Sequence, residues 1–113
     1  MNSLSPRLDQ TFRALADPTR RAVVAALGRG PASVSELARP FEMALPTFLQ
    51  HLRTLEESGL IATRKSGRVR TCTLETRALA QAANWLDDQK TLWTQRLDRL
   101  DALVLALKDK EDG

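Results

Sequence analysis

The 113-residue chain is 42% apolar and 27% charged, a composition typical of one globular domain. No apolar run approaches the roughly 18 residues of a membrane-spanning helix. The N-terminal segment has neither a basic leader nor an apolar signal core, so we expect no membrane partner and no export. Cys72 is the only cysteine, which excludes an intrachain disulfide. Such a chain suits a reducing compartment, and we expect a cytoplasmic protein.

The positive charge lies in the first two thirds of the chain. Residues 1–76 hold 11 Lys and Arg against 7 Asp and Glu, a balance of +4, whereas residues 77–113 hold 6 against 7, a balance of −1. A basic excess of this size is weak evidence for a nucleic-acid partner, since many proteins carry it. The arrangement of the charges therefore matters more than their sum.

Three short helices are predicted before residue 40. The first precedes Asp17. Asp17 followed by Pro18 is typical of a helix N-cap and a first helical residue, and opens the second helix. Ser33 with Glu36 three residues later forms a capping box for the third helix, which Pro40 ends.

The stretch up to Gly59 predicts an amphipathic helix at residues 46–58. Pro46 suits the first helical position, and Gly59 suits the left-handed residue just past a helix end. Apolar side chains recur at the spacing of one buried stripe: Leu45, Phe48, Leu49, Leu52 and Leu55. The opposite face carries hydrogen-bonding groups without formal negative charge: Thr47, Gln50, His51 and Thr54, with Arg53 at its flank. Such a face can read the major groove, although an ordinary solvated helix face has the same composition.

The third helix, a short turn and helix 46–58 form the arrangement of a helix-turn-helix. Residues 60–75 then alternate around a Ser66-Gly67 turn, a pattern that predicts an antiparallel β-hairpin. Four cations lie on this hairpin: Arg64, Lys65, Arg68 and Arg70. Like charges this close together favour contact with phosphates, the alternative being a hairpin whose charges are only solvated.

Four segments together resemble the ArsR-type winged helix-turn-helix repressors: LADPTRR at 15–21, SVSELA at 33–38, MALPTFLQHLRTLEESGLI at 43–61 and GRVRTCTLE at 67–75. The resemblance covers residues 8–76 in register. It implies a mainly α fold with a small antiparallel β-hairpin, in which helix 46–58 is the recognition helix and the hairpin is the wing. It also implies a homodimer that binds operator DNA and releases it when an effector arrives. The residues expected to contact double-stranded DNA are Pro46, Thr47, Gln50, His51, Arg53, Thr54, Arg64, Lys65, Arg68 and Arg70.

The segment 77–108 contains no Gly or Pro and predicts one long C-terminal helix, or two with a bend near residues 84–88. A three-and-four spaced apolar seam runs along it: Leu86, Trp93, Leu97, Leu100, Val104 and Leu107. A body of this size cannot easily cover so long a stripe, so we expect a partner helix from a second copy, with Leu8 and Phe12 packing nearby. The alternative is a helix folded over its own core. Residues 109–113 are expected to form a disordered tail.

The metal sites usual in the resembling family cannot be carried over. The third helix has no cysteine and the last helix has no histidine, and these are the ligands that soft and borderline metals need. For His51 we expect contact with DNA or a neighbouring helix rather than a metal. Cys72 is most simply a small strand residue, the alternative being a redox-sensing thiol whose pKa is lowered by Arg70.

The side chains suggest no catalytic site. A lone His, a lone Cys and scattered carboxylates provide no oriented nucleophile and base, so we expect neither an enzyme nor a cofactor. The prediction is a sequence-specific DNA-binding transcriptional regulator: a homodimeric repressor on an inverted-repeat operator, not metal-responsive through the usual family sites, with its effector unknown. The competing hypothesis is a winged-helix module that binds an acidic protein partner. The salt dependence of duplex binding distinguishes the two.

Overall fold

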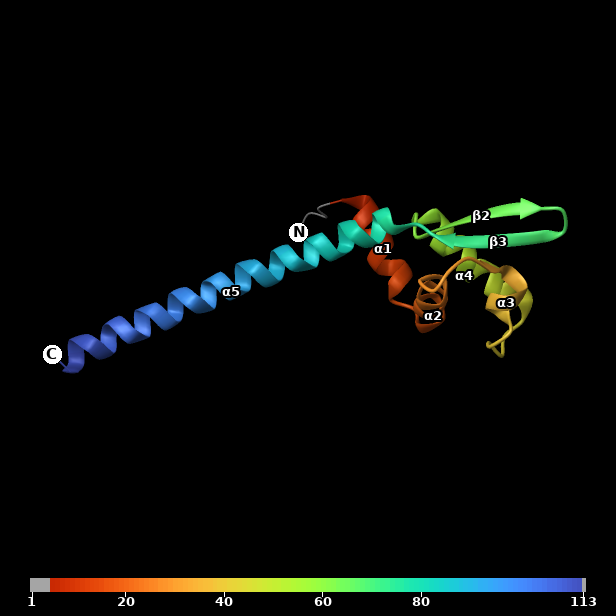
Figure 1. Ribbon diagram of the computed structural model, residues 1–113. Coiled ribbons are helices and arrows are strands. Elements are labelled where there is room, and N and C mark those ends of the chain that lie inside the picture. Colours follow the sequence, from red (N-terminus) through yellow and green to blue (C-terminus); the bar gives the residue numbers. More distant parts are fainter. Residues whose placement is uncertain (1–4, 113) are drawn as a thin grey trace. The chain divides into compact units, whose positions relative to one another are not determined.

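The computed structural model describes residues 5–112. The chain forms two compact units, one up to Ala82 and one from Ala83 on, and the last helix belongs to both. The elements in chain order are α1 (Pro6–Leu15), α2 (Pro18–Leu27), β1 (Ala32–Ser33), α3 (Val34–Ala38), α4 (Leu45–Glu57), β2 (Ile61–Ser66), β3 (Val69–Leu74) and α5 (Thr76–Asp112) (Figure 1). The mainly helical fold with a small antiparallel sheet is thus as predicted.

Local capping sets the starts of α2 and α3. The Asp17 carboxylate accepts the backbone N–H of Arg20 at 3.0 Å, and Pro18 occupies the first turn of α2. In α3 the capping box is complete, because the Ser33 hydroxyl accepts the Glu36 N–H at 3.1 Å and the Glu36 carboxylate accepts the Ser33 N–H at 3.3 Å. Both predicted starts are confirmed.

The end of α4 is a Schellman motif. The Leu60 N–H donates to the Leu55 carbonyl at 3.0 Å, and the Gly59 N–H donates to the Glu56 carbonyl at 3.1 Å. Gly59 has φ +78°, the left-handed conformation predicted for it. At the other end α4 begins at Leu45, one residue earlier than predicted, so Pro46 is its second residue.

The sheet has three strands rather than the predicted two. β2 and β3 form the expected antiparallel hairpin, with Gly67 at φ +62° in its turn. On the other side of β3, the two-residue β1 pairs Ala32 with Cys72 and Ser33 with Thr71, so the strand order is β1-β3-β2. The sheet therefore ties the start of α3 to the wing.

The core of the first unit is built on the inner face of α4. Phe48, Leu52 and Leu55 are at most 2% exposed, and they belong to one cluster with other buried side chains, Ala14, Val23, Leu27, Leu37, Leu60, Ile61 and Cys72. Leu45, which was predicted in this stripe, is instead 54% exposed. It is the first residue of α4, and the cluster of buried side chains begins one turn further along the helix, at Phe48.

α5 is one continuous helix of 37 residues rather than two helices. It also continues through residues 109–112, where a disordered tail was predicted, because no Gly or Pro occurs before Gly113 to end it. The seam side chains are 42–59% exposed within the single chain: Leu86, Trp93, Leu97, Leu100, Val104 and Leu107. Leu92, Leu103 and Leu105 are exposed as well, although they were not part of the predicted seam.

Candidate nucleic-acid interface

The outer face of α4 is held towards solvent by the burial of its inner face. Thr47, Gln50 and Arg53 are exposed, as is Pro46 in the first turn. Thr54 is half-buried, and its hydroxyl donates to the Gln50 carbonyl at 3.1 Å. The Thr54 hydroxyl thus bonds to a carbonyl one turn earlier in α4. The structure thus brings three of the predicted reading residues, Thr47, Gln50 and Arg53, to the surface with free side chains available for contact.

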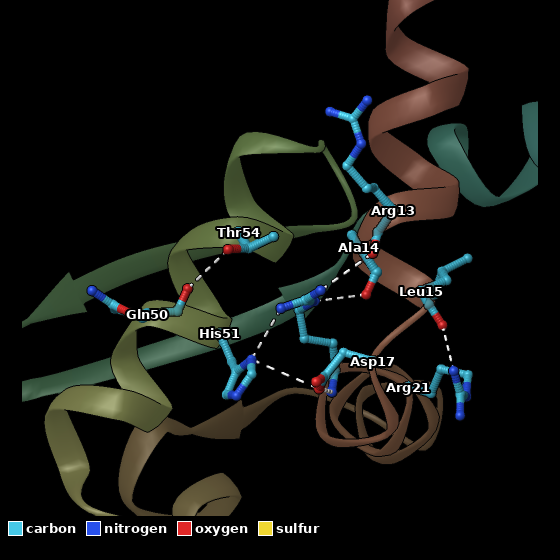
Figure 2. A network of polar contacts seen from close by, with 9 residues as sticks. Arg13, Ala14, Leu15, Asp17, Arg21, Gln50, His51 and Thr54 are labelled. Atoms are coloured by element: carbon cyan, nitrogen blue, oxygen red, sulfur yellow. Dashed lines mark hydrogen bonds and ion pairs between the residues drawn. The ribbon is translucent and has the colours of Figure 1, made fainter.

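His51 lies differently from the rest of this face. Its Nδ1 atom is 3.1 Å from Nη1 of Arg20 and 3.7 Å from Oδ2 of Asp17, both on α2. The side chain is 19% exposed, and Figure 2 shows the ring directed at Asp17 while the side chain of Gln50 points elsewhere. Of the two contacts expected for His51, DNA or a neighbouring helix, the structure displays the second.

Arg20 joins three helices, a role that the sequence analysis missed. Its Nε donates to the Ala14 carbonyl at 2.7 Å and its Nη2 donates to the Arg13 carbonyl at 3.2 Å. These carbonyls lie at the end of α1, where helical partners run out and cationic donors are favourable. The signal was present in the sequence, because two arginines follow Asp17 and Pro18 shortly after the predicted end of the first helix. The second of them, Arg21, donates to the Leu15 carbonyl at 2.7 Å.

The Asp17 carboxylate stays anionic near neutral pH. Burial acts to raise its pKa, but the hydrogen bond from the Arg20 N–H, the charges of His51 and Arg20, and the bond from the Thr19 N–H together hold the pKa below the ordinary 3.8. Its charge is therefore available both to cap α2 and to face the His51 ring.

The four wing cations do not form one patch. Across the hairpin, Lys65 pairs with Arg70 and Thr63 pairs with Cys72. Residues two apart on a strand share a face, so Lys65 and Arg70 lie on the sheet face that carries the buried Cys72. Arg64 lies on the opposite face, and Arg68 is in the turn. All four side chains are exposed. Side chains alternate between the two faces of a strand, so the wing cations are divided between both faces. The prediction of a cationic hairpin did not include this division.

A chain of hydrogen bonds connects the wing to α4. Nη2 of Arg70 donates to the Thr63 hydroxyl at 3.4 Å, and that hydroxyl donates to the two carboxylate oxygens of Glu56 at 3.2 and 3.3 Å. The Glu56 carboxylate thus offsets part of the Arg70 charge. Among the wing cations, Arg68 in the turn is the better placed to neutralise an external phosphate.

The thiol of Cys72 is fully buried, with 0% exposure. Burial raises its pKa above the ordinary 9.0, the nearby Arg70 charge acts to lower it, and Glu56 raises it further. The net effect is upward, whereas a reactive thiol needs a lowered pKa and access to the oxidant. These two properties count against the redox-sensing alternative, which assumed that Arg70 would lower the pKa.

Metal binding finds no support within residues 5–112. No three His, Cys, Asp or Glu side chains of that part of the chain are grouped so that they could hold a metal ion. Its helices also include none that is long and apolar enough to cross a membrane.

The geometry defines a class of protein. A helix-turn-helix formed by α3 and α4, with an exposed polar face on α4 and a cationic two-stranded wing, is a winged helix-turn-helix. Residues 15–64 match the family model described as a helix-turn-helix domain. The chain is 39% identical over 89 residues to the HTH-type transcriptional regulator Rv2034 of Mycobacterium tuberculosis, covering 79% of this chain and 80% of that protein.

Two further comparisons identify the family. The arsenical resistance operon repressor of Escherichia coli is 32% identical over 96 residues, covering 84% of this chain and 80% of that protein. A crystal structure of an ArsR-family transcriptional regulator has 53% identity and a TM-score of 0.77, covering 83% of this chain and 97% of that one. The chain belongs to the ArsR family. It is a DNA-binding transcriptional regulator and not an enzyme.

The buried thiol leads to a prediction about its reactivity. In the folded protein, iodoacetamide should alkylate Cys72 at least about 100-fold more slowly than in denaturant, because the thiol reacts only when the core opens. Mass spectrometry over a time course measures both rates. DNA affinity should also be the same before and after brief exposure to hydrogen peroxide. A folded thiol that reacts as fast as the unfolded one, and whose modification releases DNA, would restore the redox hypothesis.

Proposed function

We propose that this protein is a homodimeric repressor that binds an inverted-repeat operator, with α4 reading the sequence and the wing supplying affinity. The observation that carries this proposal is the position of α4, which buries Phe48, Leu52 and Leu55 on one side and leaves Thr47, Gln50 and Arg53 exposed on the other. An α-helix fits the major groove, and amide and guanidinium side chains can form paired hydrogen bonds with base edges. Two-fold symmetry then places the half-site centres about one helical turn apart, roughly 10 base pairs or a multiple.

The wing has a separate role in this proposal. Arg64, Lys65 and Arg68 are exposed cations that form no ion pair within residues 5–112. Such groups neutralise phosphates, which gives affinity but little discrimination between sequences. Arg70 contributes less, because it shares the Thr63 hydroxyl with Glu56.

Mutations on the two elements should separate the two roles. Gln50→Ala should weaken operator binding by about 1 to 3 kcal/mol and leave binding to scrambled duplex nearly unchanged, because only the operator offers the matching base edge. Arg68→Ala should weaken both duplexes alike and reduce the salt slope by about one unit if the side chain meets one phosphate. Binding of each variant to both duplexes over a salt series measures these effects, after an operator has been selected from random DNA.

Gln95→Ala, at an exposed glutamine of α5, serves as the matched control for Gln50→Ala. The division of roles is wrong if Arg68→Ala changes base preference while Gln50→Ala does not. Absence of duplex binding at low salt would instead favour the acidic protein partner.

Dimerisation through α5 is the second part of the proposal. The support is the row of apolar side chains from Leu86 to Leu107, each at least 42% exposed in the single chain, on a helix whose spacing matches a coiled-coil seam. Exposed apolar rows of this length are unusual on monomers. Leu8 and Phe12 are half-buried on α1, and we assign them to the same interface.

Charges placed in the seam should separate the protomers. Leu97→Glu with Leu100→Glu would put unpaired carboxylates in a desolvated contact, so sedimentation should report monomer or unfolded chain. The matched control is Gln95→Glu with Ala102→Glu, because residues 95 and 102 lie on the opposite side of the helix. An intact dimer in the seam variant would refute this interface.

The third part of the proposal is independence from metals. It is supported by the residue types in α3 and α5 and by the lack of a three-ligand group within residues 5–112. Excess Zn(II), Cd(II) or As(III) should leave operator affinity unchanged in a fluorescence anisotropy titration, with EDTA-treated protein as the reference. A stoichiometric complex that releases the operator would overturn metal independence without affecting the DNA-binding proposal.

A further inference from the structure

The contact between Arg20 and His51 fixes the protonation pattern of the histidine ring. Their nitrogens Nη1 and Nδ1 are 3.1 Å apart, and a guanidinium can only donate. Nδ1 must therefore accept, which places the proton of the neutral ring on Nε2. In this state a single guanidinium connects α4 to two carbonyls in the last turn of α1, those of Arg13 and Ala14.

A second proton on the His51 ring would turn Nδ1 from a hydrogen-bond acceptor into a donor. Once Nδ1 carries a hydrogen it cannot accept from Arg20, and the positive ring and the guanidinium repel each other. The Oδ2 atom of Asp17 lies 3.7 Å from Nδ1, a few tenths of an ångström beyond hydrogen-bond distance. Asp17 remains anionic because its pKa lies below 3.8. A small movement of the ring would thus exchange the Arg20 contact for one with Asp17.

The charged groups facing the ring are few, which makes this exchange well defined. From α2 they are Asp17 and Arg20. α1 contributes only backbone carbonyl oxygens to this network, and the Arg13 side chain points away from the ring in Figure 2. On α4 itself, the positions three and four residues away are uncharged: Thr47, Phe48, Thr54 and Leu55. Neighbouring β2 carries its cations, Arg64 and Lys65, in the outer, exposed half of the strand.

We propose that Arg20 and His51 are positioning residues for the reading face of α4, and that protonation of His51 exchanges Arg20 for Asp17 and weakens sequence discrimination. This inference rests on the proposed function of α4. Imidazole is the side-chain type most readily protonated near neutral pH, so a pH series can test the exchange. The added charge favours any DNA through its phosphates, whereas the loss of the Arg20 contact releases α4 from α1 and leaves it held to α2 through Asp17 alone. The ratio of operator to scrambled affinity therefore falls on acidification.

The first arm of the test is independent of DNA. His51 is the only histidine of the chain, so the ring nitrogen signals of ¹⁵N-histidine protein belong to it without assignment. The expected result at neutral pH is an accepting Nδ1 with the proton on Nε2, and two protonated nitrogens at acid pH. A neutral ring protonated on Nδ1 would overturn the Arg20 contact and with it the proposal.

The second arm measures affinity for operator and scrambled duplex at pH 7.5 and pH 5.5. In the wild-type chain the ratio should fall by about threefold to tenfold, the equivalent of one lost hydrogen bond. His51→Asn retains an acceptor oxygen at the δ position but takes up no proton, so its ratio should stay at the wild-type neutral value at both pH values. A wild-type ratio that is constant with pH, or an Asn variant that follows the wild-type pH profile, would overturn the proposal.

Two more variants test the partners of the ring. Arg20→Lys retains the charge but lacks the planar fork that bridges α1 and His51, so its ratio should already be low at pH 7.5 and change little at pH 5.5. Asp17→Asn retains an N-cap but removes the anionic acceptor for the protonated ring, so its ratio should change less between pH 7.5 and pH 5.5 than that of the wild-type chain. Circular dichroism at both pH values excludes unfolding as the cause. If the wild-type chain does not distinguish operator from scrambled duplex even at pH 7.5, the proposed function is wrong. The nitrogen signals of His51 then still show whether its Nδ1 accepts from Arg20.

Discussion

The inner face of α4 constrains the whole DNA-binding unit. Phe48, Leu52 and Leu55 are buried from the first turn of the helix to its last, and full burial of each such side chain contributes about 1.5 to 3 kcal/mol. Because successive residues on a helix are about 100° apart, burying these three positions also dictates which side chains face outward. The exposed positions of Thr47, Gln50 and Arg53 are thus a consequence of core packing. A substitution in the core could disturb the outer face without touching it.

Hydrogen bonds then fix the position of α4 against its neighbours at two separate places. Near its middle, His51 meets Arg20, which also satisfies carbonyls at the end of α1. Near its end, Glu56 receives the Thr63 hydroxyl, which in turn accepts from Arg70 on the wing. α4 is therefore connected to α2 and to the wing by small groups of hydrogen bonds, and each group includes a charged side chain. Such bonds are stronger than neutral ones and depend more on their charge state.

The sequence predicted best what depends on neighbouring residues. The caps at Asp17 and Ser33 and the left-handed Gly59 involve bonds within a few residues, so residue type alone identified them. The two-residue strand β1 was missed because its partner Cys72 is 40 positions away from Ala32 and so short a strand has no periodicity of its own. The direction of the His51 ring depends on Arg20, which lies 31 positions earlier.

The candidate interface was predictable to a similar extent. The outward face of α4 and the exposure of the wing cations followed from periodicity and charge. The division of the wing cations between two sheet faces was also contained in the sequence, since Arg64 and Lys65 are adjacent and must point to opposite faces of a strand. The burial of Leu45 was predicted wrongly, because periodicity identifies a stripe but not where along the helix the core begins.

The strand order β1-β3-β2 has a consequence for how the molecule behaves among its own copies. β2 is an edge strand, and β1 covers only two residues of β3, so much of the wing presents unpaired peptide groups to its surroundings. Such edges can add a strand from another chain and start aggregation, and natural proteins oppose this with charged side chains along the edge. Arg64 and Lys65 occupy the outer half of β2, with Arg70 across from Lys65. The cations of the wing thus stand where charges oppose the pairing of this edge with a strand of another copy.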